Sequence, residues 1–179
     1  MKNKISLVKM ILSALFLAIA YVLPFFTGQI PEVGSMLCPL HIPILLCGFI
    51  CGWRYGLIVG FIAPLLRSLT LGMPPLFPTA ICMAFELAAY GLVAGIMHRL
   101  LNQKKIYIYI SLLIAMILGR VVWGIAMYTC MAINGGSFTF VAFITGAIIN
   151  AIPGIVVQII LIPPIIIFSK NKLNTLFGK

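Results

Sequence analysis

The sequence predicts an all-α integral membrane protein: a six-helix bundle in a single membrane domain, residues 1–179, with its N- and C-termini in the cytoplasm. Of the 179 residues, 63% are hydrophobic and only 8% are charged. A soluble domain of this size exposes too much surface to carry so apolar a chain. The apolar residues fall in runs close to the 20 or so residues that cross a bilayer. The basic residues lie between these runs, on one predicted side of the membrane.

The predicted helices are separated by short segments rich in polar residues, glycine or proline. The first run begins with lysines and carries a candidate signal-peptide cleavage site at Ala18-Ile19-Ala20, but it is long enough to span, so we predict an uncleaved first helix. The second and third runs hold about fifteen residues each, and as helices they would reach only about 22 Å, whereas the hydrocarbon core is about 30 Å thick. These two helices either cross the membrane fully or form a hairpin that does not cross it. We expect helices at residues 6–26, 37–51, 56–71, 77–99, 106–133 and 138–168.

The placement of the basic residues predicts the orientation. With the N-terminus inside, ten of the twelve basic residues lie at the inner face, and the outer loops 27–36, 72–76 and 134–137 hold no Lys or Arg. This distribution is typical of a multi-pass protein of the cytoplasmic membrane. We assign the net charge of +10 to contact with the lipid bilayer. The basic residues form no stripe with interleaved aromatics, so no nucleic-acid partner is predicted.

Apart from the basic residues at the inner helix ends, three charged residues lie inside predicted helices, where a charge is costly and is by default a functional hypothesis. Helix rise places Glu86 about 13 Å, Arg120 about 19 Å and Arg67 about 6 Å from the outer ends of their helices. Glu86 is expected to pair with Arg120 or Arg67, so that no isolated charge remains in the apolar interior. The remaining positive charge suits a small solute with a carboxylate or phosphate. Residues at compatible heights complete the candidate substrate-binding set: Asn150, Trp123, Tyr90, Tyr128 and His41.

Each of these residues also has a structural interpretation. Glu86 and Arg120 can form an ion pair that only fixes the helix register. Arg67 can extend its guanidinium to the outer interface. His41 can be a polar group at a helix start, and the tryptophan and tyrosines commonly serve in packing or as interface residues.

Residues for catalysis in a membrane are scarce in this chain. There is no Asp, and Glu32, Glu86, His41 and His98 form no metal set and no nucleophile–base pair. No G-x-x-x-x-G-K-[ST] phosphate loop occurs, so the chain itself is not expected to use ATP. We therefore predict no catalytic residue, no metal and no cofactor, and a protein that is not an enzyme.

The five cysteines, an odd number without paired spacing, indicate no disulfide framework. Cys47 and Cys51 are one helical turn apart and could contact a soft metal, but buried cysteines usually behave as small apolar residues. Small residues also recur at four-residue spacing, which lets another membrane helix approach closely. The glycines of this kind are interpreted as packing inside the bundle: Gly48, Gly52, Gly56 and Gly60, and Gly91 with Gly95.

Over nearly its whole length, the chain resembles the substrate-binding S component of an energy-coupling factor (ECF) vitamin transporter. The resemblance covers the size near 180 residues, the six helices with both ends inside and the basic tail. The segment "HIPILLCGFICGWRYGLIVGFIAPLLRSL" resembles the second and third helices of that family. The Ala14-x-x-x-Ala18 pattern of the first helix resembles the motif by which the family docks on its partner.

The resemblance implies a high-affinity substrate-binding subunit of an ATP-driven importer. Its partners would be a transmembrane T component and two ATPase subunits, with Ala14 and Ala18 on the face that meets the T component. In that family, the outer halves of helices 4 to 6 and the loops after helices 1 and 3 enclose the vitamin. This is where the depth estimates place the polar residues of this chain.

Two other functions and several substrates stay open at this point. A self-sufficient secondary transporter could couple protons through Glu86, although no inverted repeat is evident. A non-catalytic membrane scaffold is the other alternative. The excess of positive over negative charge inside the predicted helices favours an acidic vitamin such as pantothenate, or a folate-like or phosphorylated compound. Riboflavin or a pyridoxine-like molecule could instead stack on Trp123 and the tyrosines.

Overall fold

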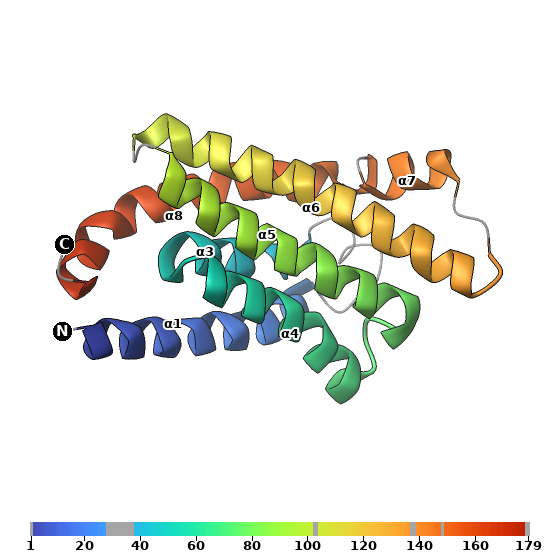
Figure 1. Ribbon diagram of the computed structural model, residues 1–179, viewed down its shortest axis with the longest axis horizontal. Helices are drawn as coiled ribbons and strands as arrows, with labels where there is room; N and C mark the ends of the chain where they lie inside the picture. The colour runs from blue at the N-terminus through green and yellow to red at the C-terminus, as the bar shows by residue number, and fades with distance from the viewer. Residues whose placement is uncertain (1, 28–37, 102–103, 137–138, 148, 178–179) are drawn as a thin grey trace.

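The computed structural model describes residues 2–27, 38–101, 104–136, 139–147 and 149–177. Over these ranges the chain is helical and contains no strand, as the fold class predicted (Figure 1). The elements are α1 (Lys2–Val22), η1 (Leu23–Thr27), α3 (His41–Cys51), α4 (Trp53–Leu71), η2 (Leu76–Ala80), α5 (Ile81–Leu100), α6 (Lys105–Ile133), α7 (Phe140–Ala147), η3 (Ile149–Ala151) and α8 (Ile152–Phe177).

Five segments of the described chain are long and apolar enough to cross a membrane. They are Ser6–Phe26, Trp53–Leu71, Leu76–Leu100, Lys105–Ile133 and Ile152–Ser169, while α3 is shorter. α1 begins and α8 ends at the same end of the bundle (Figure 1). Six spans with cytoplasmic ends stay a prediction.

The short helix α3 lies at the centre of the bundle. It packs against α1, α4, α5 and α8, and nine of its eleven residues are buried. A helix surrounded by other helices needs less length than one that faces lipid, because neighbouring protein covers its ends. Its position explains how a run too short to cross the hydrocarbon core can still belong to the fold.

The backbones of α3, α4 and α5 touch through glycines. A Cβ atom built on Gly91 of α5 would collide with the Gly56 backbone of α4, and one built on Gly48 of α3 would collide with the Gly91 carbonyl. A membrane bundle gains little from apolar burial between helices, so close van der Waals contact of this kind drives association. The predicted packing role is confirmed for Gly48, Gly56 and Gly91.

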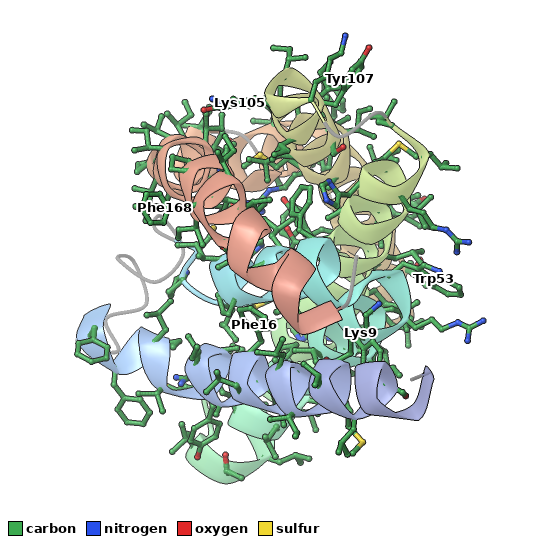
Figure 2. The ribbon with its side chains drawn as sticks, turned by 90° about the vertical axis from the view of Figure 1, so that its left-hand side faces the viewer. Lys9, Phe16, Trp53, Lys105, Tyr107 and Phe168 are labelled. Atoms are coloured by element: carbon green, nitrogen blue, oxygen red, sulfur yellow. The ribbon has the colours of Figure 1, made fainter. Side chains whose placement is uncertain are left out.

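α1 and α6 lie on opposite sides of the bundle, with α3 and α5 between them (Figures 1 and 2). Phe16 points from α1 toward the neighbouring helices (Figure 2) and packs against the buried core. The rest of the α1 surface is more open, and a stripe of it faces away from the bundle.

Two predicted helices have different bounds in the structure because of proline. The helix expected at 6–26 starts earlier, at Lys2, and its α-helical part ends at Val22, where Pro24 follows in η1. The helix expected at 138–168 is divided into α7, η3 and α8. Pro153 has no N–H, and its ring would collide with the carbonyl four residues earlier, so a helix begins at Ile152 rather than passing through.

The other boundaries also shift. The turn expected over 52–56 is reduced to Gly52, whose φ of +99° suits glycine, and α4 begins at Trp53 rather than at residue 56. The helix expected from residue 77 begins at Ile81, after the π turn η2. The helix expected from 37 begins at His41. The predicted first residues Leu37 and Phe138 lie outside the described residues.

We expect Gly91→Ala to destabilise the bundle, because its new methyl group must push α4 away from α5. Overpacking costs about 1 to 3 kcal/mol in a tight core, and here the obstacle is backbone, which cannot change rotamer. The measurement is thermal unfolding of the purified chain in detergent. Gly136→Ala is the matched control, because a Cβ there meets its nearest atom at 3.5 Å, an ordinary contact. Equal melting temperatures for the two variants would contradict the role of Gly91.

Candidate functional site

The buried carboxylate of Glu86 pairs with Arg120. Glu86 lies on α5 with 2% of its side chain exposed, and Arg120 lies on α6. The Nη1 atom of Arg120 is 3.0 Å from Oε1 of Glu86. An unpaired carboxylate would be very costly in an apolar bundle, and charges inside membranes usually face the protein interior and pair with one another. Of the two arginines that the sequence offered as partners, the structure selects Arg120.

His41 completes a group of three around the same oxygen. It is the first residue of α3, it is buried, and its Nε2 atom lies 3.4 Å from Oε1 of Glu86. The His41 ring meets the Tyr90 ring edge to face, with centroids 4.9 Å apart. Tyr90 is four residues after Glu86 on α5, so both side chains lie on one face of that helix. Tyr90 therefore supports the histidine that contacts Glu86.

A glycine makes room for this arrangement. A Cβ atom on Gly119 of α6 would lie 2.6 Å from the Tyr90 ring. Because Gly119 has no side chain, the ring can lie directly against α6, next to the residue that carries the guanidinium. Gly119 thus supplies the space for the Tyr90 ring, and the adjacent Arg120 supplies the positive charge that pairs with Glu86.

Cys38 contacts the other side of the Arg120 guanidinium. The Nη2 atom of Arg120 donates to Sγ of Cys38 at 3.5 Å. Cys38 has a φ of +48°, which is uncommon outside glycine and turns its backbone sharply just before α3. The sequence reasoning treated this residue only as a small apolar side chain.

Several buried polar atoms have no hydrogen-bond partner in the described part of the chain. Two of them belong to the group around Glu86: Nδ1 of His41 and Nε of Arg120. A third is Oε1 of Gln158 on α8, a residue that is 1% exposed. Buried polar atoms are nearly always satisfied, so each exception calls for a bound molecule or water that completes it. The open positions on His41 and Arg120 mark the surroundings of Glu86 as a candidate binding site.

Gln158 was missed by the sequence reasoning, although the sequence held a signal. It is the one amide within the apolar segment Ile152–Ser169. A polar residue in a membrane span is costly in the same way as a charge, to a smaller degree. The polar residues selected from the sequence lie in the outer half of the bundle, whereas Gln158 is about 30 Å from the outer end of the helix expected at 138–168.

Arg67 does not reach Glu86 and instead caps α1. It is buried on α4 and donates a short hydrogen bond from Nη1 to the carbonyl of Tyr21, in the last turn of α1. Its guanidinium carbon lies 5.9 Å from the Tyr21 ring centroid and 5.5 Å from that of Phe25. The hydroxyls of Tyr21 and Thr70 are 3.1 Å apart. A cation at a helix C-terminus stabilises the free carbonyls and the helix dipole.

The remaining predicted site residues are Trp123, Tyr128 and Asn150. Trp123 stacks on Phe143 of α7, with ring centroids 6.3 Å apart, and a Cβ on Gly146 would collide with its ring. Tyr128 is 63% exposed and so lies at the surface. Asn150 lies on η3, and its side chain is outside the described part of the structure, as is Glu32. A role in substrate binding stays a prediction for Trp123, Tyr128 and Asn150.

Ala14 and Ala18 lie on the face of α1 that turns away from the bundle. The same face exposes larger apolar side chains at helical spacing: Leu7, Met10, Ile11, Leu15, Ile19 and Val22. The opposite face carries the buried Ser13 and Ala20. The two alanines therefore form a shallow strip that either lipid or another membrane helix can cover.

The comparisons with known proteins gave one match. A family model described as "ECF transporter, substrate-specific component" matches residues 8–166, which include every residue of the group around Glu86. A search of curated proteins and a search of solved structures each found no match. The resemblance drawn from the sequence is confirmed by the family match.

We expect Glu86→Gln to destabilise the bundle more than the double change Glu86→Gln with Arg120→Met. The single variant leaves the Arg120 charge buried without a partner, which costs about 3 to 5 kcal/mol, whereas the double variant removes both charges. Denaturant titration in detergent gives the free energies of unfolding. Arg54→Met is the control, because Arg54 is exposed over the Trp53 ring and its loss should have little effect. A double variant less stable than the single one would contradict the coupling.

Proposed function

The chain belongs to the family of ECF transporter substrate-specific components, and we propose that it is the high-affinity substrate-binding subunit of an ATP-driven importer for a vitamin or related micronutrient. Components of this family bind a small molecule and associate with T and ATPase components. In this proposal the chain resides in the cytoplasmic membrane and supplies recognition, while the ATPases supply energy.

The observation that carries the proposal is the incomplete hydrogen bonding around Glu86. The Arg120 Nε–H is a donor without a partner in the described chain, and Nδ1 of His41 lacks one as well. An open position alone does not indicate a ligand, since Nε of Arg67 also lacks a partner although Arg67 ties α4 to the end of α1. His41 and Arg120 differ because they bring two open positions to one carboxylate, where a ligand can replace the hydrogen bonds that it gives up to water.

The open positions indicate the chemistry of the substrate. The Nε–H of arginine can only donate, so it suits a carboxylate or carbonyl oxygen. A carboxylate can only accept a hydrogen bond, so Nε2 of His41 is the donor to Glu86, and Nδ1 is then the acceptor in the neutral imidazole. A hydroxyl or amide N–H suits that atom. A small acid that also carries hydroxyl or amide groups, such as pantothenate, combines both features.

The charge balance supports an acid in a second way. The buried charges of the described bundle are the two guanidinium groups of Arg67 and Arg120 and the one carboxylate of Glu86. One positive charge is therefore left within the bundle, at Arg67 beside the end of α1. An anionic substrate would lower the cost of this charge in a medium of low dielectric constant.

The exposed strip at Ala14 and Ala18 supports the proposal that the chain associates with a T component. Small residues at four-residue spacing let a second membrane helix approach closely, and this strip belongs to the least buried of the membrane-capable helices. We assign the strip to contact with the T component. Two ATPase subunits complete the importer.

We expect one acidic vitamin to raise the melting temperature of the detergent-purified chain. The panel is pantothenate, folate, pyridoxal phosphate, riboflavin and pyridoxine. At a hundredfold excess over the Kd, a ligand that binds only the native state adds about 2.7 kcal/mol, which corresponds to a shift of about 5 to 10 °C. No shift with any compound, in a sample that unfolds cooperatively, would count against a vitamin-binding subunit.

Arg120→Lys should weaken binding of the compound that gives this shift by about tenfold or more. Lysine keeps the charge beside Glu86 but loses the planar fork and its Nε–H donor. Arg99→Lys is the matched control, because Arg99 is exposed at the far end of α5. Isothermal titration gives both Kd values. An unchanged Kd in Arg120→Lys would remove Arg120 from the binding site.

Ala14→Trp combined with Ala18→Trp should leave vitamin binding intact and abolish uptake, because the indole rings block approach of the T component. Uptake of the radiolabelled vitamin is measured in cells that contain the whole importer. The control is Ile117→Trp with Val121→Trp, which adds the same rings at the same spacing on an exposed face of α6. Normal uptake in the α1 variant, or equal loss in both, would exclude α1 as the specific docking face.

A further inference from the structure

Two buried thiols meet across the interface of α5 and α6. The Sγ atoms of Cys82 and Cys130 are 3.6 Å apart, and both cysteines are free. Cys82 is fully buried and Cys130 is 8% exposed. A disulfide bond is about 2.05 Å long, so the two sulfurs need to approach by roughly 1.5 Å to form one. Side-chain rotation and a small helix shift can supply a movement of that size.

This pair differs from the other cysteines of the chain. Cys47 and Cys51 lie on one turn of α3, and Cys47 contacts Ser13 of α1. Cys38 contacts Arg120. Among the five cysteines, all of which the structure describes, only Cys82 and Cys130 place two thiols in contact from different helices. A bond between them would join segments 48 positions apart in the chain.

The Cys82–Cys130 pair lies in the same α5–α6 interface as the candidate site. On α5, Cys82, Glu86 and Tyr90 follow one another at four-residue spacing and share one face. Opposite them on α6, Gly119 lies against Tyr90, Arg120 pairs with Glu86, and Cys130 contacts Cys82. The thiols lie at the end of the α5–α6 interface where α5 begins and α6 ends. A disulfide bond there would link the two helices that carry the Glu86–Arg120 ion pair.

We propose that Cys82 and Cys130 form a redox-active thiol pair, which small disulfides oxidise to a bond that fastens α5 to α6. The thiolate of Cys130, the more exposed sulfur, attacks one sulfur of a reagent RSSR and releases RS⁻, which takes up the proton that Cys130 lost. Cys82 then loses its proton and attacks Sγ of Cys130, and the second RS⁻ leaves as RSH. Two protein thiols lose two electrons, and RSSR gains them as two RSH.

The location is compatible with this chemistry. In the orientation predicted from the basic residues, this end of the bundle faces the outside of the cell, where thiols meet oxidants and disulfides persist. The inference does not depend on the proposed transport function, since it requires only the folded chain and the contact of the two sulfurs.

The test uses the full chain in detergent and dithiodipyridine, a small apolar disulfide, as the oxidant. We expect the number of alkylatable thiols to fall from five to three and mass spectrometry to find a peptide that links Cys82 to Cys130 within one chain. The bond should raise the melting temperature by about 5 to 10 °C, and dithiothreitol should reverse the rise.

Single variants separate the linkage from simple thiol modification. Cys82→Ser should yield only a mixed disulfide at Cys130, without the rise in melting temperature, whereas Cys47→Ser should behave like the parent. Cys82→Ala replaces Cys82→Ser if the latter does not unfold cooperatively. Three results would overturn the proposal: no reaction of the folded chain, a mixed disulfide at Cys130 in the parent without the link, or a link between other cysteines.

Discussion

The close approach of three helix backbones sets the geometry on which the candidate site depends. Gly48 of α3 and Gly91 of α5 touch, and this contact fixes how far the two helices slide along one another. His41 lies seven residues before Gly48, and Glu86 lies five residues before Gly91. On parallel helices with a rise of about 1.5 Å per residue, these offsets differ by only about 3 Å. The glycine contact therefore brings His41 to the height of Glu86.

The apolar interior then determines how the polar residues behave. A carboxylate in this medium needs a counter-charge, and Arg120 supplies it from α6 while Tyr90 and Gly119 shape the space around it. The pairing leaves hydrogen-bonding positions open on His41 and Arg120. A pair that served stability alone could be replaced by packed apolar residues at little cost. The open positions favour a site that a ligand completes, which is the role of a substrate-specific component.

α1 is less buried than the helices at the centre of the bundle. Only 17% of its apolar window is buried within the chain, against 50% of the window formed by η2 and α5. Arg67 ties the end of α1 to α4 through the Tyr21 carbonyl, so an arginine that the sequence offered as a ligand group has a clear structural task. The outward face of α1 keeps its small residues free for another helix. The proposed recognition site and the proposed docking face thus lie on different parts of the bundle.

The sequence alone determined the membrane class, the approximate helix positions, the family and the cost of the charge at Glu86, because hydropathy, length and charge are properties of a linear chain. It could not choose between Arg67 and Arg120 as the partner of Glu86, since that choice depends on the register between helices. It also missed the contact of Cys38 with Arg120 and the burial of Gln158, and it did not foresee that Tyr128 is exposed at the surface. Tertiary packing decided these points, because glycine contacts, rather than composition, fix which faces of the helices meet.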